Sequence, residues 1–220
     1  MYSDELAKKY VGSRDTFKET DSTLFEPLVE IGIVGKDILD FGCGDGRYAE
    51  IFLEMGAKSV IGIDVSPSMI EIANKRNKTG LKFLVADGAK LPFENKSFDI
   101  VFSNFVIHYF EDTYLPFSEI SRVLRNNGHF VGTYNITKVE KGFENLYNTN
   151  MPIRLGKKES GVIVQNLIKS REEIESAIKN CGLKVLKEEI LDHPNAVVDD
   201  SYEHIERIKK NAVLVVAQKI

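Results

Sequence analysis

Short apolar segments alternate with helical patterns through residues 36–134. Five of these segments are rich in β-branched and aromatic residues and are predicted to be strands: 37–41, 59–63, 82–85, 98–103 and 129–134. Near-continuous apolar strands separated by helices are typical of a parallel sheet that is covered on both faces. The pattern therefore predicts an α/β fold.

Two segments carry clear helix signals. Ser66 followed by Pro67 suits an N-cap and the first helical position, and apolar residues follow at helical spacing. Ser170 and Glu173 form a capping box, and Gly182 lies where a left-handed glycine commonly ends a helix. We expect helices after both serines.

The chain changes character after residue 134. Residues 135–169 lack clean periodicity, and an insertion of this length is expected to have some structure of its own. Two apolar segments, 183–191 and 212–218, follow, and their polar connection has room for a short helix at 201–208. They predict an antiparallel pair at the sheet edge. The expected fold is a Rossmann-like, seven-stranded, mostly parallel sheet with helices on both faces and an antiparallel C-terminal strand pair, in one domain spanning residues 1–220.

Composition narrows the function classes. The formal net charge is −4, which argues against nucleic acid as a partner because binding it usually needs a clustered basic surface. Cys43 and Cys181 lack the spacing of a zinc site or a disulfide framework, so we expect a reducing, cytoplasmic compartment. The N-terminus is charged from its fourth residue, unlike a signal peptide. Apolar runs are far shorter than the roughly 20 residues that a membrane helix needs.

A glycine-rich turn follows the first predicted strand. Gly42, Gly44 and Gly46 lie between that strand and an amphipathic helix, where glycines let the backbone approach a ligand closely. A dinucleotide fingerprint GxGxxG would require glycine at position 47, which is Arg47. The carboxylates of Asp40 and Asp45, which flank the turn, would repel a pyrophosphate and favour a cationic ligand.

Acidic residues end the next two strands. Asp64 lies 20 residues beyond Gly44, where an acid in nucleotide-binding α/β folds accepts hydrogen bonds from ribose hydroxyls. It could instead cap the next helix, although Ser66 already has that role. Asp87 with Gly88 ends the third strand, and we expect its side chain near an adenine amino group. The alternative is a simple Asp-Gly turn.

In this order, the strand, GxGxG, acid and Asp-Gly elements resemble the class I S-adenosylmethionine-dependent methyltransferases. The segment LPFENKSFDIVFSNFVIHYFED is similar to the small-molecule branch related to ubiquinone and menaquinone biosynthesis. The resemblance implies S-adenosylmethionine as cofactor and S-adenosylhomocysteine as product. It implies cofactor contacts from one set of residues: Asp40, Gly42, Cys43, Gly44, Asp64, Val65, Met69, Asp87, Gly88, Asn104 and Tyr109.

The resemblance also divides the chain into functional segments. Residues 1–35 resemble an N-terminal helical lid, in which Tyr10 would cover the sulfonium by a cation–π contact and Arg14 would bind the methionine carboxylate. Residues 36–134 form the cofactor-binding core, 135–169 an acceptor-side insertion, and 170–220 the C-terminal helix and strand pair. In the insertion, Tyr147 and Met151 are the candidate acceptor-binding residues.

Methyl transfer from a sulfonium needs no metal, because the leaving group is already activated by its positive charge. Positioning alone is worth about 7–11 kcal/mol. His108 is the candidate general base, since it follows the fourth strand at the expected site, although a structural role, packed beneath the cofactor, is the more common one for a histidine here. We expect a small-molecule acceptor. A macromolecular acceptor and a noncatalytic S-adenosylmethionine-binding protein are the alternatives, and the acceptor and oligomeric state stay open.

Overall fold

The computed structural model describes residues 21–155, 162–191, 196–198, 202 and 208–220. Its main sheet has seven strands in the order β3-β2-β1-β4-β5-β10-β8. They are β1 (Asp37–Phe41), β2 (Ser59–Asp64), β3 (Leu81–Val85), β4 (Phe98–Asn104), β5 (Leu124–Val139), β8 (Leu183–Leu191) and β10 (Ile208–Lys219). The strands β1 to β5 pair in parallel, whereas β10 is antiparallel to both β5 and β8. The predicted fold class is therefore confirmed.

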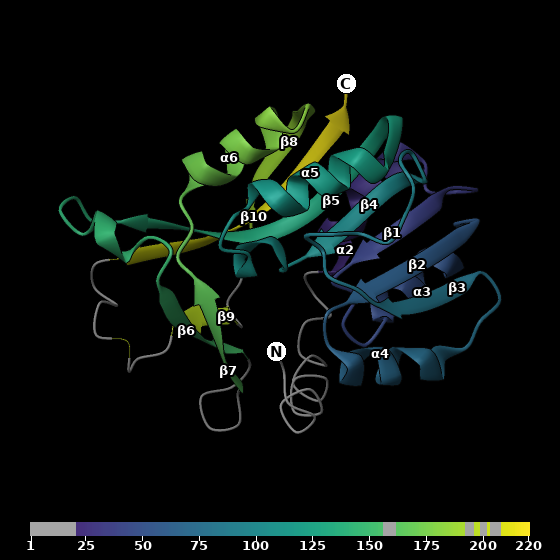
Figure 1. Cartoon of the computed structure of the whole chain (residues 1–220), viewed down its shortest axis with the longest axis horizontal. Coiled ribbons are helices and arrows are strands. Elements are labelled where there is room, and N and C mark those ends of the chain that lie inside the picture. Colours follow the sequence, from purple (N-terminus) through teal and green to yellow (C-terminus); the bar gives the residue numbers. More distant parts are fainter. Residues whose placement is uncertain (1–20, 156–161, 192–195, 199–201, 203–207) are drawn as a thin grey trace.

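Helices cover both faces of this sheet (Figure 1). On one face, α2 (Asp21–Ile31), α3 (Arg47–Glu54) and α4 (Pro67–Ala73) pack on side chains such as Ile38 and Val60. On the other, α5 (Tyr114–Val123) and α6 (Arg171–Asn180) pack on Leu39 and Val101. The adjacent residues Ile38 and Leu39 thus pack in the cores on opposite faces of the sheet, because successive side chains of a strand point to opposite faces. Among the described residues there are also three short 3-10 helices: η2 (Asn74–Arg76), η3 (Ile107–Tyr109) and η4 (Glu144–Leu146).

Both predicted helix starts are confirmed. The Ser66 hydroxyl accepts a hydrogen bond from the Met69 amide, and the Ser170 hydroxyl accepts one from the Glu173 amide at 3.0 Å. Gly182 has φ +72°, as a glycine after a helix end should. In a capping box the Glu173 side chain would accept the Ser170 amide. Here it binds the buried Lys169 ammonium at 2.8 Å.

The insertion forms a second sheet, which the sequence did not predict. The insertion contributes β6 (Asn150–Leu155) and β7 (Val162–Leu167), and the C-terminal segment adds β9 (Ala196–Val198), in the order β7-β6-β9. This sheet has a small core of its own, to which Val139 at the end of β5 contributes. Figure 1 shows it below the extended ends of β5 and β10.

Two strands are longer than predicted. β5 runs from Leu124 to Val139 instead of 129–134, and β10 begins at Ile208 instead of residue 212. The extension was hidden because Asn135 and Thr137 are polar, yet both are buried. Most of the helix proposed for 201–208 lies outside the described residues, and Ile208 itself belongs to β10.

Candidate cofactor and acceptor site

The glycine-rich turn is held against β2. The amides of Gly42 and Cys43 both donate to the Ile63 carbonyl, at 2.8 and 2.7 Å. Gly42 has φ +77°, and a Cβ added there would lie 2.3 Å from the Val106 Cγ2. Both the backbone conformation and the space therefore require glycine at this position. The turn ends at Gly46, after which α3 begins with Arg47.

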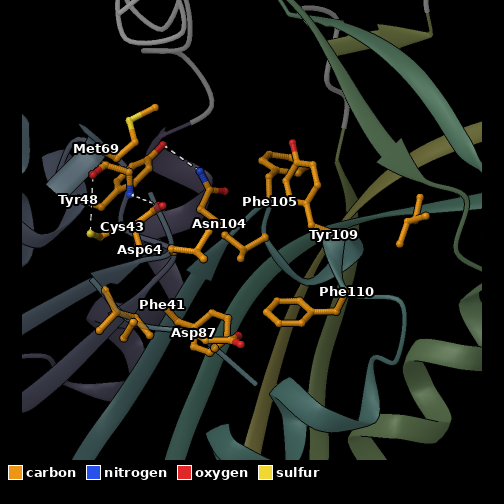
Figure 2. A pocket seen from close by; sticks show the side chains of 18 of the residues that line it. Phe41, Cys43, Tyr48, Asp64, Met69, Asp87, Asn104, Phe105, Tyr109 and Phe110 are labelled. Carbon is orange, nitrogen blue, oxygen red and sulfur yellow. Dashed lines mark hydrogen bonds between the residues drawn. The ribbon is translucent and has the colours of Figure 1, made fainter. Parts of the chain in front are cut away.

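Asp64 lies at the carboxyl end of β2 and faces this turn (Figure 2). One carboxylate oxygen accepts the Gly44 amide at 3.0 Å, and the other accepts the Ser66 amide at 2.9 Å. The turn, β2 and the start of α4 are thereby fixed around one carboxylate.

Asp87 and Asn104 end two further strands at the same edge. Asp87 accepts the Ala89 amide at 2.9 Å, so it does stabilise a turn, and it also lines the cavity. Gly88 is required by packing, because an added Cβ would lie 2.2 Å from the Phe41 ring. The Asn104 side chain accepts a hydrogen bond from Thr133 and donates to the Tyr48 hydroxyl at 3.3 Å.

These strand ends open onto one cavity of about 490 Å³. That volume is typical of a small-molecule site. The lining residues that the sequence predicted as cofactor contacts are Gly42, Cys43, Gly44, Asp64, Val65, Met69, Asp87, Gly88, Asn104 and Tyr109. Figure 2 shows Cys43, Asp64 and Met69 on one side of this cavity and Phe105, Tyr109 and Phe110 on the other.

The charge around the cavity is negative. Among the described lining residues, Asp64, Asp87 and Glu111 are the charged ones, and no lysine, arginine or histidine is among them. Burial raises the pKa of the Cys43 thiol far above its usual range, and the Asp40 and Asp64 carboxylates raise this pKa further. The field at the turn therefore favours a cation, as expected for the net-positive S-adenosylmethionine.

Some predicted residues do not reach the cavity. Asp40 is buried and lies outside the lining set. Asp45, expected to add to the negative field, is paired with Arg76 at 3.3 Å. Tyr10 and Arg14 lie outside the described residues, so their roles stay predictions.

His108 is not on the cavity wall either. It is 1% exposed, and its ring lies behind Tyr109 with 4.6 Å between the ring centroids. Burial, together with the charge of Lys210, lowers the pKa of His108 to about 3. A group this weakly basic and closed off from the cavity is unsuited to the general-base role, and the packing role fits its position.

The two acceptor-side candidates point away from the cavity. Met151 is fully buried in the core of the second sheet, and Tyr147 packs against that core while its hydroxyl accepts the Val139 amide at 3.4 Å. Asn150, next to Met151 on β6, lines the cavity instead, with Gln165 and Leu167 of β7. The insertion reaches the cavity as expected, but through the opposite face of its strands.

Sequence reasoning also missed several wall residues. They are Phe41, Tyr48, Ile63, Ala86, Phe105, Val106, Phe110 and Glu111, besides the three from the second sheet. The feature that marks Phe105 is visible only in the structure: its φ is +57°. A positive φ is uncommon for a bulky residue, and such strained residues cluster at functional sites.

The described residues contain no group of three or more His, Cys, Asp or Glu side chains placed to hold a metal ion. Within the same residues, no helix is long and apolar enough to cross a bilayer.

A parallel sheet with a glycine-rich turn after β1 and an acid at the end of β2 defines an α/β protein of the nucleotide-binding class. Residues 39–132 match the family model described as a methyltransferase domain. The chain belongs to the class I S-adenosylmethionine-dependent methyltransferases, whose cofactor is S-adenosylmethionine.

The chain is also similar to several individual proteins. A malonyl-acyl-carrier-protein O-methyltransferase of Legionella pneumophila is 35% identical over 136 residues, which are 57% of this chain and 48% of the relative, so the chain spans about half the length of that relative. An uncharacterized protein of Methanocaldococcus jannaschii is 30% identical over 204 residues, 84% of this chain and 76% of that one. The solved S-adenosylmethionine-dependent methyltransferase from Mesorhizobium loti shares the fold, with a TM-score of 0.63 at 21% identity over 90% of this chain and 99% of that one.

Proposed function

We propose that this protein transfers the methyl group of S-adenosylmethionine to a small-molecule acceptor by in-line displacement. One observation carries the proposal: a single cavity of about 490 Å³ joins the glycine-rich turn and Asp64 to residues of the second sheet. A cofactor at the turn and an acceptor beneath the second sheet would share one enclosed space.

The residues of the cofactor side fit S-adenosylmethionine chemically. Asp64 would accept hydrogen bonds from the ribose hydroxyls, Asp87 would lie near the adenine, and the turn would approach the methionine moiety through its glycines. When bound, the cofactor supplies a methyl group that is already activated by the sulfonium charge. The N-terminal residues Tyr10 and Arg14 would complete the site from the preceding segment.

The chain's own contribution is placement and exclusion of water. The aromatic residues Phe105, Tyr109 and Phe110 form an apolar wall that would keep water from the acceptor atom. Alignment of two reactants in such a space is worth about 7–11 kcal/mol of the barrier. A buried general base such as His108 is not needed for this mechanism, and a general base on the cavity wall would add a factor of about 10² to 10⁴.

The test begins with ligand stabilisation. S-adenosylhomocysteine at 100 times its Kd should stabilise the native state by about 2.7 kcal/mol. For a chain of this size that corresponds to a rise of roughly 5–10 °C in Tm. NAD should give no rise. The reverse pattern would refute the proposal.

Turnover is then measured with methyl-labelled S-adenosylmethionine and pools of small metabolites. Transfer of label to a small product is the expected result. Binding of cofactor without transfer to any small-molecule or macromolecular pool would indicate the noncatalytic alternative. Transfer only to protein or nucleic acid would indicate a macromolecular acceptor.

A further inference from the structure

The end of the cavity away from the glycine-rich turn is built from two segments far apart in the chain. The segment after β4 contributes Phe105, Tyr109, Phe110 and Glu111, and the second sheet contributes its outer face, including Asn150 and Gln165. Figure 2 places Phe105 and Tyr109 side by side, across the cavity from Asp64 and Met69.

Glu111 gives the acceptor end its charge. Glu111 is exposed to solvent and lines the cavity. Within the described part of the chain, its carboxylate has no hydrogen bond or ion pair. The nearby Lys169 binds the Glu111 backbone carbonyl at 2.7 Å, and the charge of that buried lysine is balanced by Glu173 at 2.8 Å. The carboxylate is therefore available to a ligand.

The aromatic side chains beside Glu111 also suit a cation. Phe105 is held at φ +57° by hydrogen bonds from its amide to the Thr133 carbonyl and hydroxyl, at 2.9 and 3.1 Å. Tyr109 is supported from behind by the His108 ring. Aromatic faces together with a carboxylate are the usual surroundings of ammonium groups in proteins. Strained backbone that is fixed this firmly is a recurring feature of ligand sites.

We infer that the acceptor is an amine on an apolar carbon skeleton, bound through its ammonium group by Glu111 and the rings of Phe105 and Tyr109. This inference rests on the proposed function and adds the acceptor class to it. A carboxylate or phosphate acceptor would instead bring a second negative charge to a wall whose described charged residues are all acidic.

The reaction balances for an amine. The bound ammonium gives one proton to the Glu111 carboxylate, which passes it to solvent because it is exposed. The nitrogen lone pair then forms the bond to the methyl carbon while the carbon–sulfur bond breaks and its electron pair stays on sulfur. The positive charge moves from sulfur to the N-methylated product, so no further co-reactant is required.

The experiment compares three probes that share a phenyl group and differ in their polar end: 2-phenylethylamine, 2-phenylethanol and 3-phenylpropanoate. Binding of each probe to the full chain saturated with S-adenosylhomocysteine is measured by calorimetry, and methylation is measured with labelled S-adenosylmethionine. The amine should bind most tightly and be methylated, and the carboxylate should bind most weakly.

Variants then test the assigned residues. Glu111→Gln should weaken amine binding about tenfold, since a hydrogen bond to a charged group is lost, and should change alcohol binding by less than about twofold. Tyr109→Leu should weaken amine binding about threefold through the lost cation–π contact. Glu172→Gln, which removes the same charge from an exposed position on α6, is the matched control and should change neither.

Different outcomes distinguish a failure of the proposed function from a failure of the amine assignment alone. If S-adenosylhomocysteine does not bind, the proposed function fails. If it binds but the carboxylate probe is bound as tightly as the amine, or no probe is bound, or Glu111→Gln leaves amine binding unchanged, the amine assignment alone is overturned.

Discussion

Replacing Gly42 by alanine tests whether the glycine-rich turn is required by conformation, by space, or by both. The residue has φ +77°, and a left-handed backbone costs a non-glycine residue about 1–2 kcal/mol. The new Cβ would also lie 2.3 and 2.8 Å from the two Cγ atoms of Val106. Overpacking of this kind typically costs about 1–3 kcal/mol. Gly42→Ala should therefore lower the free energy of unfolding by about 2–5 kcal/mol.

Two further variants separate these contributions. Gly182 has a similar φ of +72°, but an added Cβ there would have no atom within 4 Å, so Gly182→Ala should cost only the backbone part, about 1–2 kcal/mol. Val106→Ala removes both Cγ atoms and leaves the Cβ at 3.1 Å. In that background the additional cost of Gly42→Ala should fall to about 1–2 kcal/mol as well.

The assay is urea unfolding followed by circular dichroism, with the free energy extrapolated to water for the wild type, the three single variants and the double variant. A Gly42→Ala protein within about 0.5 kcal/mol of wild type, which is the usual range for a harmless substitution, would refute both contributions. An equal cost of Gly42→Ala with and without the Val106 methyl groups would refute the steric one.

Three other variants test separate parts of the structure. Asp64→Asn should weaken S-adenosylhomocysteine binding by about 1.5–3 kcal/mol through loss of charged hydrogen bonds; unchanged affinity in a folded variant by calorimetry would limit Asp64 to holding the turn. Because the native pKa of His108 is about 3 against 6.5 unfolded, the unfolded state binds the extra proton between these values, and stability falls as pH drops below 6.5. At 1.36 kcal/mol per pH unit, this loss of stability is about 2 kcal/mol between pH 6.5 and 5.0, and His108→Gln should remove it. Urea unfolding at both pH values measures the effect, and parallel pH profiles of wild type and variant would contradict the prediction. Ser170→Ala should cost about 1 kcal/mol by removing the N-cap of α6, and a Tm equal to that of wild type would show that the cap contributes nothing.

Much of the core could be predicted from the sequence because its signals are local. An N-cap serine such as Ser66 or Ser170 acts on an amide three residues away, so its effect is visible in the spacing alone. The glycines of the turn and the acid at the end of β2 are likewise set by where a strand stops. Since parallel strands end at the same edge, their order along the chain was enough to gather Gly42, Asp64, Asp87 and Asn104 into one site.

The acceptor side depended on contacts that only the folded chain makes. Asn135 and Thr137 continue a strand although they are polar: both are buried, their backbone pairs with β10, and the Asn135 side chain contacts the His108 ring. On β6, Met151 was predicted to bind the acceptor, but it packs in the core of the second sheet, and its neighbour Asn150 lines the cavity instead. His108 became a buried, weakly basic ring for the same reason: its environment comes from distant residues such as Asn135 and Lys210. Alternation along a strand shows which residues share a face, but only the packing of distant elements decides which face meets the ligand.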